Sequence, residues 1–512
     1  FVPKELVLHL TAAAVALCLS RTPRRVALTL PDAAIALFLL LGALSATLAT
    51  NHWLAARALA ISVSGATLFW GARAVARAGL ARPLVAALAA ATALAALTSL
   101  FQAYGVETEY FSLNRAPGGT FGNRNFVAHL SAVGLPLVVL YALTARGSFG
   151  ALLGAIGAGL AAAALVLSRS RGAWLAVAAT ALPAVVALWR ARRLEQERSD
   201  TGRRVLLGLA AGAGVAAALL LPNTLNWKSD SPYLDSVRGV VDYRQGSGHG
   251  RLVQYHNTLR IALDHPVLGV GPGNWPVWYP RYASPGDPSL TDDAMTANPW
   301  PSSDWAATVA ERGIAATLLL ALVFLAAGTR SLRGVFRARR AEELLAPAAL
   351  GAVLLAALVV GAFDAVLLLA APALVVWTAL GALWPDDAAP VREGARARRT
   401  IPLGDGAWRR VAAALAFVGL FFAVRSTTQL ASMAIVGTGV RTGALGWAAA
   451  VDPGAYRVHL WLARNAASHG RCGSVRTHAA AANLLFPSAP EPRRLLGRCG
   501  VSVPRPEARP GR

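Results

Sequence analysis

Acidic residues and cysteines are scarce in this sequence. Only 26 of the 512 residues are Asp or Glu, and there are three cysteines. The CxxC and HxxxH spacings of zinc sites are absent, and the aspartates form no compact group. No nucleophile-elbow motif is present either. These absences argue against metal catalysis and against a serine hydrolase, so we expect neither a metal nor another cofactor.

Hydrophobic residues, in contrast, make up 55% of the chain. They form runs of about 16 to 23 residues, which are long enough to cross the hydrocarbon core of a membrane as helices. These runs recur as far as residue 428, so a single cleaved leader cannot explain them. We therefore expect an all-α polytopic membrane protein of about twelve spans. The predicted spans are 5–20, 33–49, 53–70, 83–101, 126–144, 150–167, 173–189, 205–221, 305–327, 345–362, 366–384 and 411–428.

The net charge of +23 follows the loops between these spans. Alternate loops hold 24 arginines, and the short loops between them hold four. Such asymmetry orients a membrane protein with its basic loops in the cytoplasm, which explains the excess charge without a nucleic-acid partner. The basic loops are 21–32, 71–82, 145–149, 190–204, 328–344 and 385–410, and the four remaining arginines are Arg115, Arg124, Arg169 and Arg171.

This orientation divides the chain into parts. Residues 1–428 form the predicted membrane domain, in which residues 222–304 are a long outward loop, and residues 429–512 form an outward tail. With twelve spans, the N-terminus also faces outward. Because the sequence begins with Phe1 rather than Met, this orientation favours a further helix upstream of the sequence.

The outward loop 102–125, "QAYGVETEYFSLNRAPGGTFGNRN", combines glycines with Arg115 and two asparagines near its end. It is either a glycine-rich connector or a re-entrant loop that binds an anion through its amides and Arg115. These residues do not distinguish the two.

The long loop contains "GRLVQYHNTLRIALDHPVLGVGPGNW". Its apolar residues recur at helical spacing, which predicts an amphipathic helix on the membrane face, from near Arg251 to the residue before "DHP". The segment 269–275, "GVGPGNW", cannot continue a helix. Because no Walker lysine follows it and no strand precedes it, we expect a turn rather than a phosphate-binding loop. The helical stripe is formed by Leu252, Tyr255, Leu259 and Leu263.

Four segments in this order, "GGTFGNRNFVAHL", "SRSRGAWLAV", the long-loop segment above and "AERG" at 310–313, resemble the O-antigen ligase and O-antigen polymerase family. The resemblance spans roughly residues 30–385. It implies a glycosyltransferase C type fold in a bacterial cytoplasmic membrane. It also implies transfer of a glycan from an undecaprenyl diphosphate carrier to an acceptor on the outer side, without metal or nucleotide sugar.

The resemblance also implies roles for particular arginines. Arg171 matches the arginine of the family "SRGAW" motif, and Arg251 matches the arginine before "HPVLGVG". Both are expected to bind the donor diphosphate, with Arg115 and Arg169 assisting, because a guanidinium fork can contact phosphate oxygens in pairs. The alternative for Arg169 and Arg171 is that they are interfacial arginines, which reach lipid phosphates.

The chain departs from the family at one position. Where the family has a His thought to activate the acceptor, this sequence has Ser302. A serine hydroxyl is not a general base at neutral pH, so another group is needed. The candidates are Asp304, then Glu311 or His256.

The tail contains two prolines, Pro453 and Pro487, 34 residues apart, with helical patterning between them. This is the tetratricopeptide (TPR) period, so we expect a TPR-like helical unit that packs on the membrane domain or a partner. Cys472 and Cys499 both occur in "RCG". In an oxidising space outside the membrane, they are candidates for a disulfide, although two free thiols remain an alternative.

The favoured function is thus a lipid-linked glycan ligase or polymerase of surface polysaccharide, such as lipopolysaccharide. Its expected partners are the undecaprenyl diphosphate-linked glycan, an acceptor that is a glycan, lipid or protein, membrane lipids, and other envelope polysaccharide proteins at the tail. Two alternatives stay open: a transporter or flippase of polyprenyl-linked or other anionic substrates, and a non-catalytic scaffold of an envelope complex.

Overall fold

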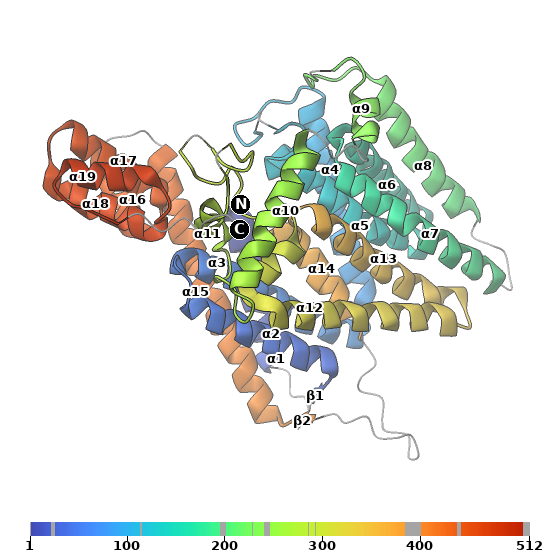
Figure 1. The fold of residues 1–512 in the computed structure, drawn as a ribbon. Coiled ribbons are helices and arrows are strands. Elements are labelled where there is room, and N and C mark those ends of the chain that lie inside the picture. Colours follow the sequence, from blue (N-terminus) through green and yellow to red (C-terminus); the bar gives the residue numbers. More distant parts are fainter. Residues whose placement is uncertain are drawn as a thin grey trace.

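The structure is a computed structural model and describes residues 2–21, 26–112, 115–194, 201–227, 229–239, 246–284, 286–291, 293–384, 401–437 and 442–504. Within these residues, eleven helices are long and apolar enough to cross a membrane. The chain is therefore a multi-pass helical membrane protein, as the sequence predicts (Figure 1). The eleven are α1 (Val2–Arg21), α2 (Leu30–Thr47), α3 (His52–Arg77), α4 (Ala81–Ala103), α5 (Arg124–Thr144), α6 (Ser148–Ser168), α7 (Arg171–Leu194), α8 (Thr201–Leu220), α12 (Asp304–Arg337), α13 (Ala341–Phe363) and α15 (Asp405–Gly437).

The predicted span 366–384 differs from the structure. Only α14 (Ala370–Ala382), a helix of 13 residues, forms there, and it is shorter than the other apolar helices. The preceding residues leave the helical path because the backbone N–H groups of Val366 and Leu367 donate to the carboxylate of Asp304. Hydropathy alone cannot reveal this, because the apolar run continues unbroken through the bend.

The bundle has one large apolar core between α1 to α7 and α12 to α14. α5 and α13 lie inside it and contact each other, and α13 also packs against α7 and α12. Small residues permit close packing: a Cβ at Gly381 of α14 would lie 2.1 Å from the carbonyl oxygen of Phe69 in α3. The Ala and Gly content of the chain thus lets its helices approach closely, as is usual in membranes.

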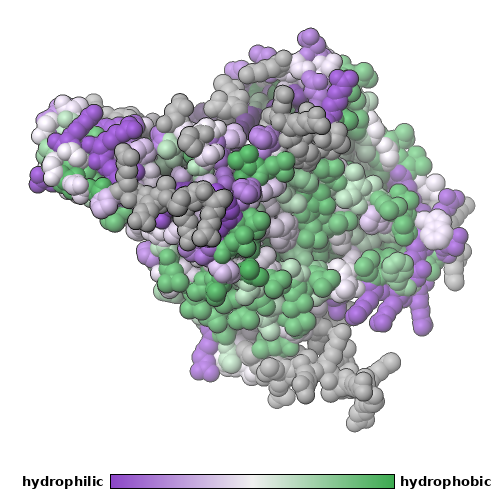
Figure 2. All heavy atoms as spheres, in the orientation of Figure 1, coloured by the Kyte–Doolittle hydropathy of each residue, from purple (hydrophilic) through white to green (hydrophobic). Residues whose placement is uncertain are grey.

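The described residues of the six arginine-rich loops gather at one end of the bundle. The strand β1 (Val26–Leu28) pairs antiparallel with β2 (Ile401–Leu403), which joins the first and last of these loops. Side chains connect the others, and the arginines that donate to a carbonyl oxygen in or beside another of these loops are Arg82, Arg190, Arg203 and Arg330. In Figure 2, hydrophobic residues cover much of the flank of the bundle, and hydrophilic residues gather on the tail and near the helix ends.

The long loop is folded at the opposite end. It contains α9 (Pro232–Arg238), α10 (Gly246–Asp264), α11 (Trp275–Trp278) and the short 3-10 helix η3 (Tyr279–Arg281). Another 3-10 turn, η2 (Gly119–Phe121), lies in the loop between α4 and α5. α10 lies across the bundle (Figure 1). It begins before the predicted start near Arg251 and ends at Asp264, the first residue of "DHP", rather than before it.

The apolar stripe predicted on α10 is largely exposed. Leu252, Leu259 and Leu263 are 49%, 55% and 65% exposed, which is expected of side chains that face lipid. Tyr255 departs from the stripe, because its hydroxyl donates inward to the carbonyl oxygens of Ser302 and Ala362.

The tail forms four short helices that pack in sequence, namely α16 (Thr442–Val451), α17 (Tyr456–Ser468), α18 (Cys472–Leu485) and α19 (Pro490–Arg498). A disulfide joins Cys472 to Cys499, 27 residues apart. The tail is tied to the membrane domain by hydrogen bonds from Asn51 to the carbonyl oxygen of Leu485 and from Ser488 to that of Val277. Its classification as a TPR-like unit stays a prediction.

Candidate functional site

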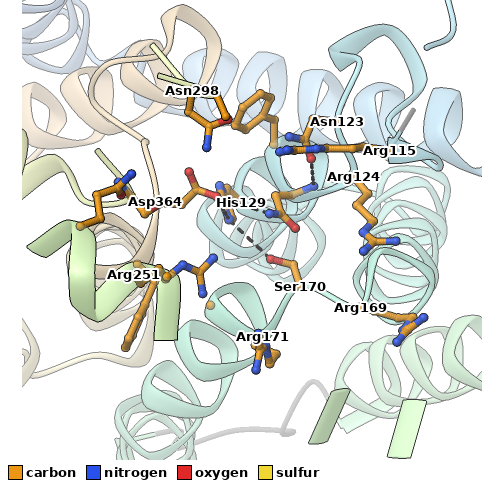
Figure 3. Close-up of a pocket in the computed structure, with 18 of the residues that line it drawn as sticks. Arg115, Asn123, Arg124, His129, Arg169, Ser170, Arg171, Arg251, Asn298 and Asp364 are labelled. Atoms are coloured by element: carbon orange, nitrogen blue, oxygen red, sulfur yellow. Dashed lines mark hydrogen bonds and ion pairs between the residues drawn. The ribbon is translucent and has the colours of Figure 1, made fainter. Parts of the chain in front are cut away.

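A cavity of about 880 Å³ lies at the end of the bundle that carries the long loop. It is formed where α5 and α7 begin, where α6 and α13 end, and where α9, α10 and residues 288–302 cover them. Figure 3 labels ten of its residues, whose side chains converge from these separate elements. Its arginines are Arg115, Arg124, Arg169, Arg171 and Arg251, and its acidic residues are Asp235 and Asp364.

The turn between α6 and α7 places two of these arginines. Arg169 ends α6 in the left-handed backbone conformation, with φ of 54°, and α7 begins at Arg171. A non-glycine residue adopts this conformation at some cost, and such residues are often found at functional sites. The sequence "SRSRG" is therefore a tight reversal that presents both guanidinium groups to the cavity.

Neighbouring residues hold Arg169 and Arg171 in place. Arg169 Nε donates to Ser236 Oγ at 2.9 Å, and its guanidinium lies 4.6 Å from the ring centre of Trp227. Burial lowers the pKa of Arg169, and the charge of Asp235 raises it in opposition. Arg171 Nη1 donates to the carbonyl oxygen of Gly239. Both side chains thus belong to a fixed surface, which is what a preorganised anion site requires.

Arg251 and Arg115 differ from this pair. Arg251 enters the cavity from α10, and Arg115 enters from the loop before α5 (Figure 3). Within the described residues, neither has a hydrogen bond or ion pair to another part of the protein. Their donors are therefore available to a ligand.

The glycines beside Arg115 do not supply anion-binding amides. The N–H groups of Gly118 and Gly119 both donate to Gln102 Oε1 at 2.8 Å. Of the two expectations for residues 102–125, these amides favour a connector that folds onto α4. The side chains of the segment that line the cavity are Arg115, Asn123, Arg124 and Asn125.

A second group of cavity residues surrounds Asp364. Asp364 Oδ2 lies 3.9 Å from His129 Nε2, and Asn125 Nδ2 approaches the same oxygen at 3.5 Å. His129 Nε2 also lies 3.5 Å from Ser170 Oγ. The His129 side chain is only 2% exposed, and that of Asp364 is 14% exposed. Asp364 is therefore the more accessible proton-accepting group of this pair.

The electrostatic balance of the cavity favours an anion. Five arginines face two aspartates, so the lining carries an excess of positive charge next to a hydrophobic bundle. Guanidinium groups bind phosphate oxygens in pairs, and a poorly hydrated surrounding strengthens that attraction. Among the described residues, no group of three His, Cys, Asp or Glu side chains is arranged to hold a metal.

Asp304, the first candidate for the base, lies outside this lining. It is 1% exposed at the start of α12, and its carboxylate accepts the backbone N–H groups of Val366 and Leu367 at 2.9 to 3.1 Å. These bonds fix the segment that follows Asp364. Asp304 thus has a structural position behind the cavity rather than a position within it.

Glu311 is also buried away from the cavity. Its carboxylate accepts the N–H groups of Gly273 and Trp275 at 2.8 and 3.1 Å. α12 is kinked two residues later, at Gly313 with φ of 80°, and the segment 269–275 packs on this kink. The segment is a turn, as predicted, and the anion that its amides bind is the carboxylate of Glu311.

His256, the remaining candidate, is exposed on α10 and is not part of the cavity lining. Ser302, at the family histidine position, does line the cavity. The sequence argument assigned no site role to Arg124, His129 or Asp364, although the first two lie in the quoted segment "GGTFGNRNFVAHL". A polar residue at the end of a predicted outward span is the signal that could have found them.

Comparison with protein families gives one match. Residues 156–321, about a third of the chain, match the family described as O-antigen ligase. The matched segment contains Arg169, Arg171 and Arg251, whereas Arg124 and Asp364 lie outside it. No curated protein matches the chain in a sequence search.

Proposed function

Since residues 156–321 carry a domain of the O-antigen ligase family, we propose that this membrane protein transfers a glycan from undecaprenyl diphosphate to an acceptor in surface polysaccharide synthesis. The family supports a ligase or polymerase type of enzyme. The observation that carries the proposal for this chain is the convergence of five arginines on one cavity with only two aspartates.

The arginines bind the diphosphate and stabilise the charge that grows on it. As the bond between the glycan and the diphosphate breaks, negative charge develops on the leaving oxygen. Cationic donors that are already in position lower the energy of this transition state. Arg171 and Arg251 are the principal donors, with Arg115, Arg124 and Arg169 on the other side of the cavity (Figure 3). The reaction needs neither metal nor nucleotide sugar.

The reaction takes place on the outer side of the bacterial cytoplasmic membrane. The described residues of the six arginine-rich loops lie together at one end of the bundle. The positive-inside rule assigns that end to the cytoplasm. The cavity and the tail belong to the other end. The disulfide between Cys472 and Cys499 is compatible with an oxidising space there.

The acceptor is a glycan, a lipid or a protein, and the tail is the surface for other envelope polysaccharide proteins. Membrane lipids contact the apolar flank and the exposed stripe on α10. The donor is shared by all three acceptor classes, so the donor half of the reaction is the one to test first.

The test is glycan transfer from a purified undecaprenyl diphosphate-linked donor by the reconstituted protein. We expect Arg171→Ala and Arg251→Ala each to lower turnover by about 10² to 10³, the usual cost of removing one preorganised donor to a developing charge. Arg192→Ala is the matched control, because Arg192 is an exposed arginine in the last turn of α7, at the opposite end. Near-normal transfer by both cavity variants would refute the proposal and favour a non-catalytic scaffold.

Orientation is tested separately with single cysteines in a Cys18→Ala background. In intact cells, Glu109→Cys and Arg457→Cys should react with a membrane-impermeant thiol reagent, whereas Arg192→Cys and Arg333→Cys should not. All four positions are exposed, so side-chain burial does not bias the comparison. The opposite labelling pattern would place the cavity in the cytoplasm.

A further inference from the structure

We propose that Asp364 is the general base that accepts the proton of the acceptor hydroxyl, and that His129 positions it. This inference rests on the proposed function and supplies the base that Ser302 cannot provide. It follows from the only arrangement in the described part of the chain in which a carboxylate and an imidazole lie side by side on the lining of the arginine cavity.

One oxygen of Asp364 is bound and the other faces its polar neighbours. Oδ1 accepts the backbone N–H of Ala365 at 2.9 Å, which anchors the carboxylate where α13 ends. Oδ2 faces Asn125 and His129 at 3.5 and 3.9 Å. These distances are long for hydrogen bonds, so Oδ2 keeps lone pairs for an incoming hydroxyl.

His129 is a positioning residue. Its ring is buried on α5, and its Nε2 lies between Asp364 Oδ2 and Ser170 Oγ. A neutral imidazole with its proton on Nε2 can donate toward the carboxylate, which fixes the rotamer of Asp364.

The backbone that carries Asp364 is held from behind. The N–H groups of Val366 and Leu367 donate to Asp304, which is buried at the start of α12. Two carboxylates thus act at the same turn: Asp304 binds its backbone, and Asp364 is part of it. Asp304 is saturated by backbone donors and fixes the turn, and Asp364 faces the ligand.

The other polar groups of the cavity fit this task less well. Asp235 accepts the hydroxyl of Ser229 and lies on α9, next to Arg169. His249 is exposed on α10. The hydroxyls of Ser170 and Ser302 are too weakly basic at neutral pH.

The proposed step is a direct displacement. The acceptor oxygen forms a bond to the anomeric carbon of the glycan, and the bond between that carbon and the diphosphate oxygen breaks. The electron pair of the broken bond stays on the diphosphate, which the arginines stabilise. The proton of the acceptor hydroxyl goes to Asp364 Oδ2, so atoms and charge balance without a further reactant.

The experiment compares Asp364→Asn with the wild-type enzyme in the reconstituted transfer assay, together with binding of undecaprenyl diphosphate alone. Asn keeps an oxygen for the Ala365 N–H but cannot accept a proton. We expect kcat to fall by about 10² to 10⁴, the usual range for a lost general base. Affinity for undecaprenyl diphosphate should stay equal or increase, because the cavity loses a negative charge.

Asp230→Asn is the matched control, since it makes the same substitution at an exposed residue of the long loop that does not line the cavity, and we expect only a small change in its kcat. His129→Asn should lower kcat less than Asp364→Asn, with the KM for the donor little changed. A merely structural role of His129 would instead change folding, KM and kcat together.

Two outcomes overturn the assignment. Near-normal turnover of Asp364→Asn while Arg171→Ala is inactive would refute the base and leave the proposed function standing. Loss of undecaprenyl diphosphate binding in Asp364→Asn would show that Asp364 supports the fold of the cavity rather than proton transfer. If Arg171→Ala, Arg251→Ala and Asp364→Asn were all fully active, the proposed function itself would fail.

Discussion

Two regions of this protein, the turn 269–275 and the arginine cavity, have the composition of an anion site. They differ in whether the chain itself supplies a partner for their hydrogen-bond donors. In the turn 269–275, backbone amides meet the carboxylate of Glu311, so donor and acceptor both come from the chain. In the cavity, five arginines face two aspartates, and Arg115 and Arg251 have no internal partner among the described residues.

The difference shows how a structural polar cluster can be distinguished from a ligand-binding site. A donor group that is satisfied within the fold stabilises that fold, because breaking the bond would leave a buried polar group unpaired. A donor group that the fold leaves unpaired on a cavity wall is available to a ligand. Residue type alone does not distinguish the two cases. The presence or absence of a hydrogen-bond partner within the protein does.

Among the tests that compare the two regions, the largest effect is expected from changing the shape of a cavity cation without changing its charge. Arg251→Lys and Arg171→Lys should be impaired nearly as much as the alanine variants, by about 10² in turnover, because Lys loses the two-pronged geometry. Transfer assays at matched expression and equal thermal stability check this. Full activity of both lysine variants would mean that the cavity supplies only a diffuse charge.

Substitutions in the turn 269–275 should instead change the stability of the protein. Gly269 has φ of 67°, and a Cβ there would lie 2.3 Å from the backbone carbon of Glu311. Gly269→Ala should therefore lower the free energy of unfolding by about 2 to 5 kcal/mol. Thermal unfolding in detergent measures it, with Gly212→Ala on α8 as the control, because no atom lies within 4 Å of a Cβ at that glycine. Equal stability of the two variants would contradict the packing.

Removing the charge of Glu311 should have a smaller effect. Glu311→Gln keeps one acceptor oxygen but turns an amide group toward the second backbone donor, so we expect a loss of about 1 to 3 kcal/mol in the free energy of unfolding. When equal amounts of folded wild-type and Glu311→Gln protein are assayed, the KM for the donor should differ little between them. A selective loss of turnover in stable Glu311→Gln protein would give Glu311 a chemical role after all.

The smallest expected effect is that of salt, which should change ligand binding in the cavity but not the contact between Glu311 and the turn. Raising the salt concentration screens exposed charges more than buried ones, so the donor KM should rise several-fold. The buried contact between Glu311 and the turn should be unaffected, which hydrogen exchange of the Gly273 and Trp275 amides can measure. If the donor KM did not depend on the salt concentration, the cavity arginines would be either inaccessible to solvent or not involved in binding.

The sequence predicted the arginines of the cavity better than the base. Arg115, Arg169, Arg171 and Arg251 were selected by loop position and motif, and the structure brings all four to one lining. Asp304, Glu311 and His256 were selected as titratable groups that could replace the missing family histidine, but the structure places all three away from that lining. Position along the chain does not reveal the side toward which a carboxylate points.

The sequence by itself determined the membrane character, the helix positions and the separation of basic from non-basic loops. Each of these depends on composition over a run of residues, because transfer of a helix into lipid depends on its summed hydrophobicity. Only the tertiary structure decided that the predicted span 366–384 begins as a bend, that Glu311 is bound by the turn 269–275, and that Asp364 lies beside His129. These depend on individual polar contacts between residues tens to hundreds of positions apart, and such contacts leave no periodic pattern in the sequence.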